Sequence, residues 1–207
     1  MSTTNTQVLP AGTWRVDKIH SSVGFAIDYM AGVFHGTFSE FDAALADGVL
    51  SGSAKVASVQ VQDENLAGHL QSPDFFDAER HPELTFTSSS IHRDGDRVTI
   101  DGDITIKGHT EAVELTGRIS DPIADPYGGE RFGLTLETVI DRATFGVSWN
   151  NPLPSGEPAL SNEVKLTVEL QLSKRCLRAR DVAGPYSLEE RTEVVLRCRS
   201  GWDGLRR

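Results

Sequence analysis

Apolar and polar residues alternate along almost the whole segment from Gly12 to Leu172, and no other feature constrains the fold of this chain as strongly. The alternation is clearest near the end of that segment, where polar residues separate Val164, Leu166, Val168, Leu170 and Leu172. A period of two places successive side chains on opposite faces of a strand. The pattern therefore predicts strands with one buried face and one face in water.

The same alternation recurs in residues 23–29, 98–106 and 132–136. Between the alternating runs stand turn pairs in which glycine can adopt a positive φ: Asp47-Gly48, Asp94-Gly95 and Lys107-Gly108. About eight sequential antiparallel strands with little helix between them favour an all-β fold, either an up-and-down barrel or a sandwich, over a parallel α/β sheet.

Residues 63–82 interrupt the alternation with helix-compatible residues between turn signals. They predict a long crossing segment with one or two short helices. Four apolar residues in it, Leu66, Leu70, Phe75 and Phe76, could cover one end of a barrel, or they could anchor the segment on the outer wall. For Ser72 and Asp77 we expect capping of a helix or turn rather than contact with a ligand.

Charge divides the chain into two parts. The 207 residues include 20 basic and 30 acidic residues, but from position 174 onward nine are basic and five are acidic. The acidic body disfavours binding to nucleic acid. We therefore predict one domain over residues 12–173 and a basic C-terminal tail, residues 174–207, that is poorly ordered.

Location and covalent framework follow from what the sequence lacks. No apolar run approaches the roughly 20 residues of a membrane span, and the start of the chain lacks the basic and apolar segments of a secretory signal, so we expect a cytoplasmic protein. The two cysteines, Cys176 and Cys198, both lie in the tail, which argues against a disulfide framework in the main domain.

Familiar catalytic motifs are missing: there is no glycine-rich phosphate loop, no H-E-x-x-H and no G-x-S-x-G. The six histidines are scattered singly, so neither a metal nor another cofactor is expected. One alternative remains for a metal, because His69 and His81 share the crossing segment and could converge in space.

Large apolar side chains recur on many of the expected strands, and a closed barrel of about eight strands can hold one small ligand among them. The candidate lining is Trp14, Phe25, Ile27, Phe34, Phe38, Phe75, Phe76, Phe86, Phe132, Leu134 and Phe145. A ligand cavity and a packed core need the same inward apolar face, so periodicity leaves both open.

Four ordered motifs carry a resemblance to a known family. The first is GTWRVDKIHSSVGFAI, which contains Trp14, Asp17, His20, Ser21 and Phe25. The others are HLQSPDFFDAERHPELTFTS at 69–88, GDITIKGHTEAVEL at 102–115 and DRATFG at 141–146. Together they resemble the YceI-like, polyisoprenoid-binding family over about residues 12–173.

The resemblance implies a lipocalin-like antiparallel barrel whose elongated pore holds an isoprenoid or a similar long-chain lipid. Polar groups would fix the head of that lipid, and the candidates are His20, Ser21, Tyr29 and Arg142. Members commonly have histidine where this chain has Tyr29. For Arg142, a structural ion pair with Asp17 is the alternative, since a buried guanidinium needs compensation.

Three functions follow as hypotheses. The leading one is a non-enzymatic carrier or sequestering protein for a polyisoprenoid, an isoprenoid quinone or a fatty lipid. The second is an enzyme that acts on a lipophilic substrate inside the barrel, using His20 with Asp17. The third is a solidly packed interaction module without a ligand. A homodimer is left open as the assembly.

Overall fold

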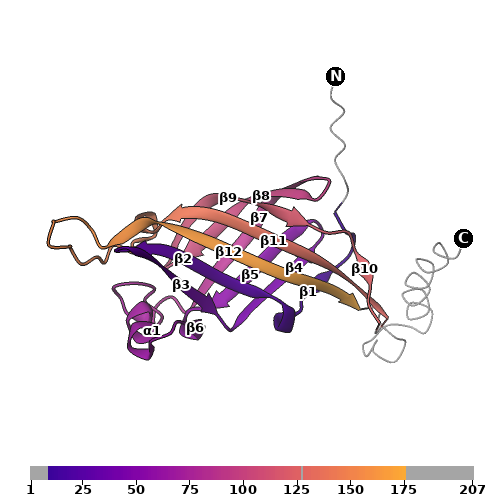
Figure 1. Cartoon of the computed structure of the whole chain (residues 1–207). Coiled ribbons are helices and arrows are strands. Elements are labelled where there is room, and N and C mark those ends of the chain that lie inside the picture. The colour runs from indigo at the N-terminus through magenta and orange to yellow at the C-terminus, as the bar shows by residue number, and fades with distance from the viewer. Residues whose placement is uncertain (1–8, 127, 176–207) are drawn as a thin grey trace, which may run out of the picture.

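The computed structural model describes residues 9–126 and 128–175 (Figure 1). The prediction of a poorly ordered tail concerns, from residue 176 onward, residues that lie outside this described part. The strands are β1 (Trp14–Val16), β2 (Ser22–Tyr29), β3 (Gly32–Phe38), β4 (Phe41–Ala46), β5 (Val49–Lys55), β6 (Val59–Gln60), β7 (Glu83–Asp94), β8 (Arg97–Ile106), β9 (His109–Ile119), β10 (Ile123–Ala124), β11 (Gly129–Asp141) and β12 (Leu160–Arg175). The helices are η1 (Lys18–His20), η2 (Val56–Ser58), α1 (Glu64–Gln71) and η3 (Arg142–Phe145).

The sheet closes on itself through β12, the longest strand. One edge of β12 pairs with β11 over thirteen residues, from Gly129 opposite Arg175 to Asp141 opposite Glu163. Its other edge pairs with β1 and then with β2. The fold is therefore a closed antiparallel barrel of eight strands, which confirms the all-β barrel prediction and excludes the sandwich.

The first three barrel strands are each bent into two pieces. β1 and β2 share one edge of β12 and are separated by η1, while β4 pairs with β1 and β3 with β2. In the same way β5 pairs with β4 and β6 with β3. The chain thus runs up and down around the barrel in sequence order.

Two of the predicted tight turns have positive φ at both central residues, as a type I′ hairpin requires. Asp47 and Gly48 have φ of 52° and 79°, and Lys107 and Gly108 have 50° and 77°. The β2–β3 hairpin turns at Met30, with φ of 52°, and neither of its central residues, Met30 and Ala31, is a glycine, so the turn pairs did not mark it in the sequence.

The crossing segment forms α1, and Asp63 caps its start with a carboxylate that accepts a hydrogen bond from the Leu66 amide at 2.9 Å. Ser72 caps the other end, and its amide donates to the His69 carbonyl. The helix lies at one end of the barrel beside β6 (Figure 1). Among the described residues no helix is long and apolar enough to cross a membrane.

The opposite end of the barrel is tightly packed around Trp14, which is 1% exposed. Its indole ring meets the Phe132 ring edge to face, with centroids 4.9 Å apart, and its Nε1 donates to the Pro10 carbonyl at 3.1 Å. Leu172 is fully buried in the same layer. The barrel is thus closed at this end by side chains.

Candidate binding cavity

An apolar cavity of about 220 Å³ occupies the α1 end of the barrel. For comparison, a dry cavity of about 150 Å³ in another protein is large enough to bind benzene. The lining residues are Phe25, Ile27, Tyr29, Phe34, Phe38, Leu66, His69, Leu70, Phe75, Phe76, Leu84, Ile106, Ile140, Arg142, Phe145, Val147, Trp149, Leu160, Val164 and Leu166. The interior of the barrel is therefore not solidly packed.

A second cavity, of about 130 Å³, adjoins the first. Phe38, Leu84, Ile106 and Leu166 line both cavities, so the two meet at these side chains. Along β12 the inward residues pass from the first cavity at 164 to the second at 170, about 20 Å at the usual rise of a strand. Together they form an elongated apolar interior that ends at the layer of Trp14.

Residues of the crossing segment close the first cavity from the α1 end. Phe76 contacts the rings of Phe25 and Phe38, with centroids 6.2 and 6.0 Å away. The His69 ring stands edge-on to the rings of Phe75 and Trp149, with centroids 4.9 Å away in each case. Leu66, Leu70, Phe75 and Phe76 all line the cavity, so the prediction that they cover one end is confirmed and the outer-wall alternative is wrong.

Arg142 is the positively charged residue in this lining and is only 5% exposed. Its Nε donates to the Ser161 carbonyl at 2.8 Å, and its Nη1 donates to the carbonyls of Val147 at 3.1 Å and Trp149 at 2.7 Å. Burial lowers the pKa of Arg142 from its ordinary value, and Asp141 opposes that effect. The guanidinium is thus held by neutral backbone groups, and the alternative of an ion pair with Asp17 is wrong.

The structure places most of the predicted lining residues on a cavity. Phe25, Ile27, Phe34, Phe38, Phe75, Phe76 and Phe145 line the first cavity, as do Tyr29 and Arg142 from the predicted head-group set, and Phe86 lines the second. Three others require correction, since Trp14, Phe132 and Leu134 line neither of these cavities and belong to the packed core. An inward position in the alternation marks packed and cavity-lining residues equally.

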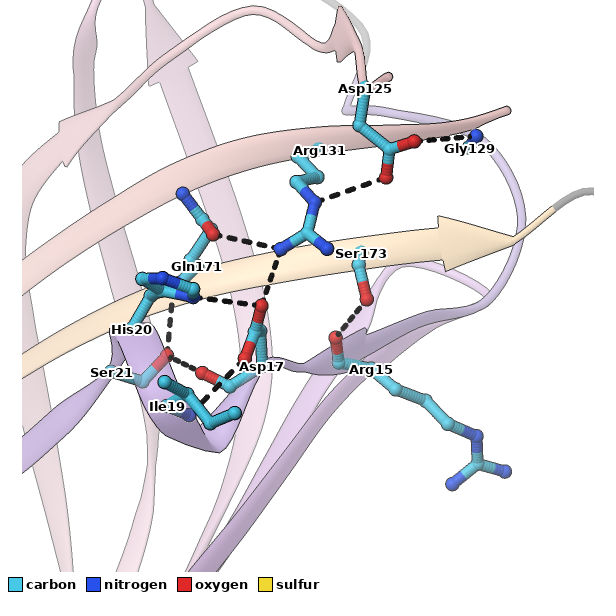
Figure 2. A network of polar contacts seen from close by, with 10 residues as sticks. All are labelled: Arg15, Asp17, Ile19, His20, Ser21, Asp125, Gly129, Arg131, Gln171 and Ser173. Carbon is cyan, nitrogen blue, oxygen red and sulfur yellow. Dashed lines mark hydrogen bonds and ion pairs between the residues drawn. The ribbon is translucent and has the colours of Figure 1, made fainter. Parts of the chain in front are cut away.

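His20 and Ser21 also require correction, because they lie outside both cavities in a polar network beside β1 (Figure 2). The side chain of His20 is 61% exposed, and its Nδ1 is 3.0 Å from Oδ2 of Asp17. The Ser21 hydroxyl donates to the Asp17 carbonyl at 2.7 Å and accepts from the Gln171 amide at 2.9 Å. Ser21 thus joins the end of η1 to β12.

Asp17 and Arg131 form the centre of this network (Figure 2). The Arg131 guanidinium donates to Asp17, to the Gln171 side-chain carbonyl at 2.9 Å and to Asp125 at 3.1 Å. The hydrogen bond from Arg131, with a smaller contribution from His20, lowers the pKa of Asp17 to about 2. The network fastens η1 and β10 to the barrel where β1 and β2 are separated.

Sequence reasoning missed two groups of residues. Arg131, which partners Asp17, and Asp125, which partners Arg131, lie 114 and 108 positions beyond Asp17 along the chain and left no local signal. The cavity also takes Val147, Trp149 and Leu160 from either side of an irregular loop. Only the apolar character of these three residues could have suggested a buried position, because the loop has no periodicity.

No group of three or more His, Cys, Asp or Glu side chains that could hold a metal ion occurs in the described part of the chain. His69 instead places its Nε2 3.2 Å from Asp74, besides its two ring contacts. The arrangement at His69 is therefore that of a rim residue that packs and forms hydrogen bonds.

Comparison with known sequences gives consistent matches. The model of the YceI-like domain matches residues 14–172. Protein YceI of Escherichia coli O157:H7 is 33% identical over 147 residues, covering 66% of this chain and 77% of the relative. Protein YceI of Salmonella newport is 31% identical over 148 residues, covering 67% and 78%.

Solved structures with the same fold include BcnA of Burkholderia cenocepacia, with a TM-score of 0.62, 24% identity and coverage of 75% of this chain and 98% of that one. The YCEI protein of Campylobacter jejuni has a TM-score of 0.59 and 25% identity, with coverage of 68% and 84%. A polyisoprenoid binding domain from Saccharophagus degradans has a TM-score of 0.55 and 13% identity, with coverage of 77% and 97%. The likenesses to BcnA and to the polyisoprenoid binding domain are of fold alone.

Proposed function

The chain belongs to the YceI-like family, and from that premise we propose that its barrel binds, carries or sequesters a long-chain lipophile. The ligand classes that fit are a polyisoprenoid, an isoprenoid quinone and a fatty lipid. The observation that carries the proposal is the elongated apolar interior formed by the two adjoining cavities. The fold shared with a polyisoprenoid binding domain supports it.

Affinity in such an interior comes from burial of hydrocarbon. Each Å² of apolar surface removed from water contributes about 25 cal/mol, and this contribution needs no directional contact. The lining of the first cavity is almost wholly aliphatic and aromatic, with Tyr29, His69 and Arg142 as the polar exceptions. We therefore expect weak discrimination between chains of similar length and bulk.

The two rival hypotheses lose their structural support. An enzyme that uses His20 and Asp17 on a substrate inside the barrel needs both side chains at the cavity, whereas they lie in the network of Figure 2. A solidly packed interaction module needs a filled interior, whereas the barrel contains two cavities. Binding without catalysis is the function that the interior favours.

Leu166→Trp tests the proposal, because Leu166 lines both cavities and a larger side chain there fills the space where they meet. Val139→Trp is the matched control, since Val139 lies on the neighbouring strand β11 and is 59% exposed. We expect farnesol, followed by calorimetric titration, to bind the natural protein and the control, and to bind Leu166→Trp at least tenfold more weakly.

The same titration can contradict the proposal. If farnesol binds Leu166→Trp as tightly as the control, and circular dichroism shows both variants folded, the ligand does not occupy this interior. A natural protein that binds neither farnesol nor other long-chain lipophiles would reject carriage altogether.

A cytoplasmic location is a further prediction of the same proposal, and a homodimer is left open as the assembly. Fractionation of the host cell, followed by immunodetection of the chain, tests the location. Sedimentation equilibrium of the purified protein tests the assembly, with a monomer at all concentrations contradicting the dimer.

A further inference from the structure

Arg142 carries a buried positive charge at the apolar cavity, and no carboxylate of the described residues forms an ion pair with it. Its nearest acidic neighbour in the sequence, Asp141, is exposed and accepts a hydrogen bond from the Ala143 amide as the cap of η3. A buried charge without a charged partner is costly, so this arrangement calls for a second role besides holding the loop.

The hydrogen bonds of the guanidinium leave part of it unused. Nε and Nη1 donate to three backbone carbonyls, and Nη2 has no acceptor among the described residues. No fully buried side-chain nitrogen or oxygen in this part of the chain lacks a partner, so Nη2 reaches open space. Since Arg142 lines the first cavity, that space is available to a ligand.

The other titratable groups that line the two cavities do not offer a ligand a second fixed positive charge. His69 and Tyr29 are the other titratable groups that line the first cavity, and Asp42 is the one that lines the second. His69 is engaged with Asp74, and Tyr29 is 41% exposed at the end of β2. Arg142 is therefore the fixed positive charge that a ligand in the first cavity would meet.

We propose that the natural ligand is an amphiphile with an anionic head, and that this head is bound by the Nη2 side of Arg142 while the hydrocarbon runs toward the second cavity. Carboxylate and phosphate oxygens share the required chemistry, since both accept charge-assisted hydrogen bonds from a guanidinium. The proposal rests on the binding function above and adds the class and orientation of the ligand.

The register of β12 supports this orientation. Arg142 donates to the Ser161 carbonyl at the start of β12, next to Leu160 at the α1 end of the first cavity. From there the inward residues of β12 are apolar through Leu166 to Leu170. A ligand with its head at Arg142 can thus extend its chain along this apolar line.

A matched pair of ligands tests the proposal on the unaltered protein. Farnesoic acid and farnesol share one hydrocarbon chain and differ in whether the head is a carboxylate or a hydroxyl. Because a hydrogen bond to a charged group is roughly twice as strong as one between neutral groups, we expect calorimetric titration at neutral pH to show that the acid binds at least tenfold more tightly.

Two variants locate the source of the preference. Arg142→Gln removes the buried charge and should abolish the preference for the acid, while Arg118→Gln removes an exposed charge, paired with Asp96 outside the cavities, and should retain it. Equal binding of acid and alcohol to the natural protein would overturn this inference but leave carriage of lipophiles intact. Binding of neither ligand would overturn both.

Arg142 also holds the loop, so its variant could fail to fold, and a second measurement avoids the need for it. The pKa of farnesoic acid labelled with ¹³C at the carboxyl group can be followed by NMR in the unaltered protein. Contact with the guanidinium lowers that pKa below its value in water, whereas an apolar site without a nearby cation raises it. A raised or unchanged pKa would contradict the proposed contact. Farnesyl phosphate and phenyl phosphate carry the same head and differ in the length of the apolar group. Comparing their affinities separates binding that depends on the chain from capture of any phosphate.

Discussion

Asp17 illustrates how far a residue's role depends on partners that lie distant in the sequence. The sequence pointed to Asp17 beside His20, and the structure adds Arg131 and Asp125. With Arg131 as its main partner, the carboxylate has a pKa of about 2. A lowered pKa means that the ionised carboxylate is more stable in the folded protein than in the unfolded chain.

Asp17→Asn should therefore destabilise the protein by about 1–2 kcal/mol at neutral pH. The contribution of Asp17 is fully present above the ordinary carboxyl pKa of 3.8 and is lost as the pH falls through about 2. Urea denaturation of both proteins between pH 7 and pH 2 measures the difference between them, which should shrink below about pH 4.

Glu40→Gln is the control for this prediction. Glu40 and Lys55 form an exposed pair 2.8 Å apart, with side chains 62% and 57% exposed, so the loss of this pair should change the free energy of unfolding much less than Asp17→Asn does. A difference between natural protein and Asp17→Asn that stays constant down to pH 2 would contradict the assigned role of Asp17.

Phe132 and Phe25 have the same side chain in different surroundings. Phe132 is 2% exposed and packs on Trp14, whereas Phe25 lines the first cavity. Phe132→Ala should cost about 3–5 kcal/mol of unfolding free energy, and Phe25→Ala should cost less because its surroundings already contain empty space. Denaturant titration measures both losses. Equal losses would indicate that the interior at Phe25 is as tightly packed as the layer of Trp14.

At the scale of elements, alternation and turn residues predicted where strands lie but not where they bend. The turns at Gly48 and Gly108 were found because glycine marks them, while the turn at Met30 has no such mark. The separation of β1 from β2 by η1 depends on the network around Asp17. Only the folded barrel brings that network together, so no local pattern could indicate it.

Among the glycines of the described strands, Gly117 lies closest to the backbone of a neighbouring strand, at the place where β9 pairs with β11. A Cβ on Gly117 would lie 1.8 Å from the Thr135 carbonyl oxygen and 3.0 Å from the Leu136 Cα, and backbone atoms cannot move aside cheaply. Gly117→Ala should destabilise the protein by about 2 kcal/mol or more, as measured by thermal unfolding.

Gly133→Ala, on β11 itself, is the matched control. A Cβ there would meet only the Ser120 hydroxyl at 3.7 Å, an ordinary contact, so a small gain in stability is expected from the reduced freedom of the unfolded chain. If Gly117→Ala were tolerated as well as Gly133→Ala, the pairing of β9 with β11 would differ from the one described.

For the whole molecule, the sequence predicted an all-β chain but left barrel and sandwich open on its residues alone. Closure depends on the pairing of β12 with the first two strands, which joins residues more than 130 positions apart. Whether the interior was empty or filled was equally open, since both states use the same inward faces. Whether space remains depends on the sizes of the inward side chains around Leu166, between Trp14 at one end of the barrel and Phe76 at the other.

Carriage of a lipophile by this interior is the central claim, and native mass spectrometry of the protein purified from its own host tests it most directly. We expect a mass increment that corresponds to one lipophile per chain, and organic extraction should release the same molecule for identification. Protein that is free of any such molecule, and that binds no added prenyl or acyl lipid, would contradict the account.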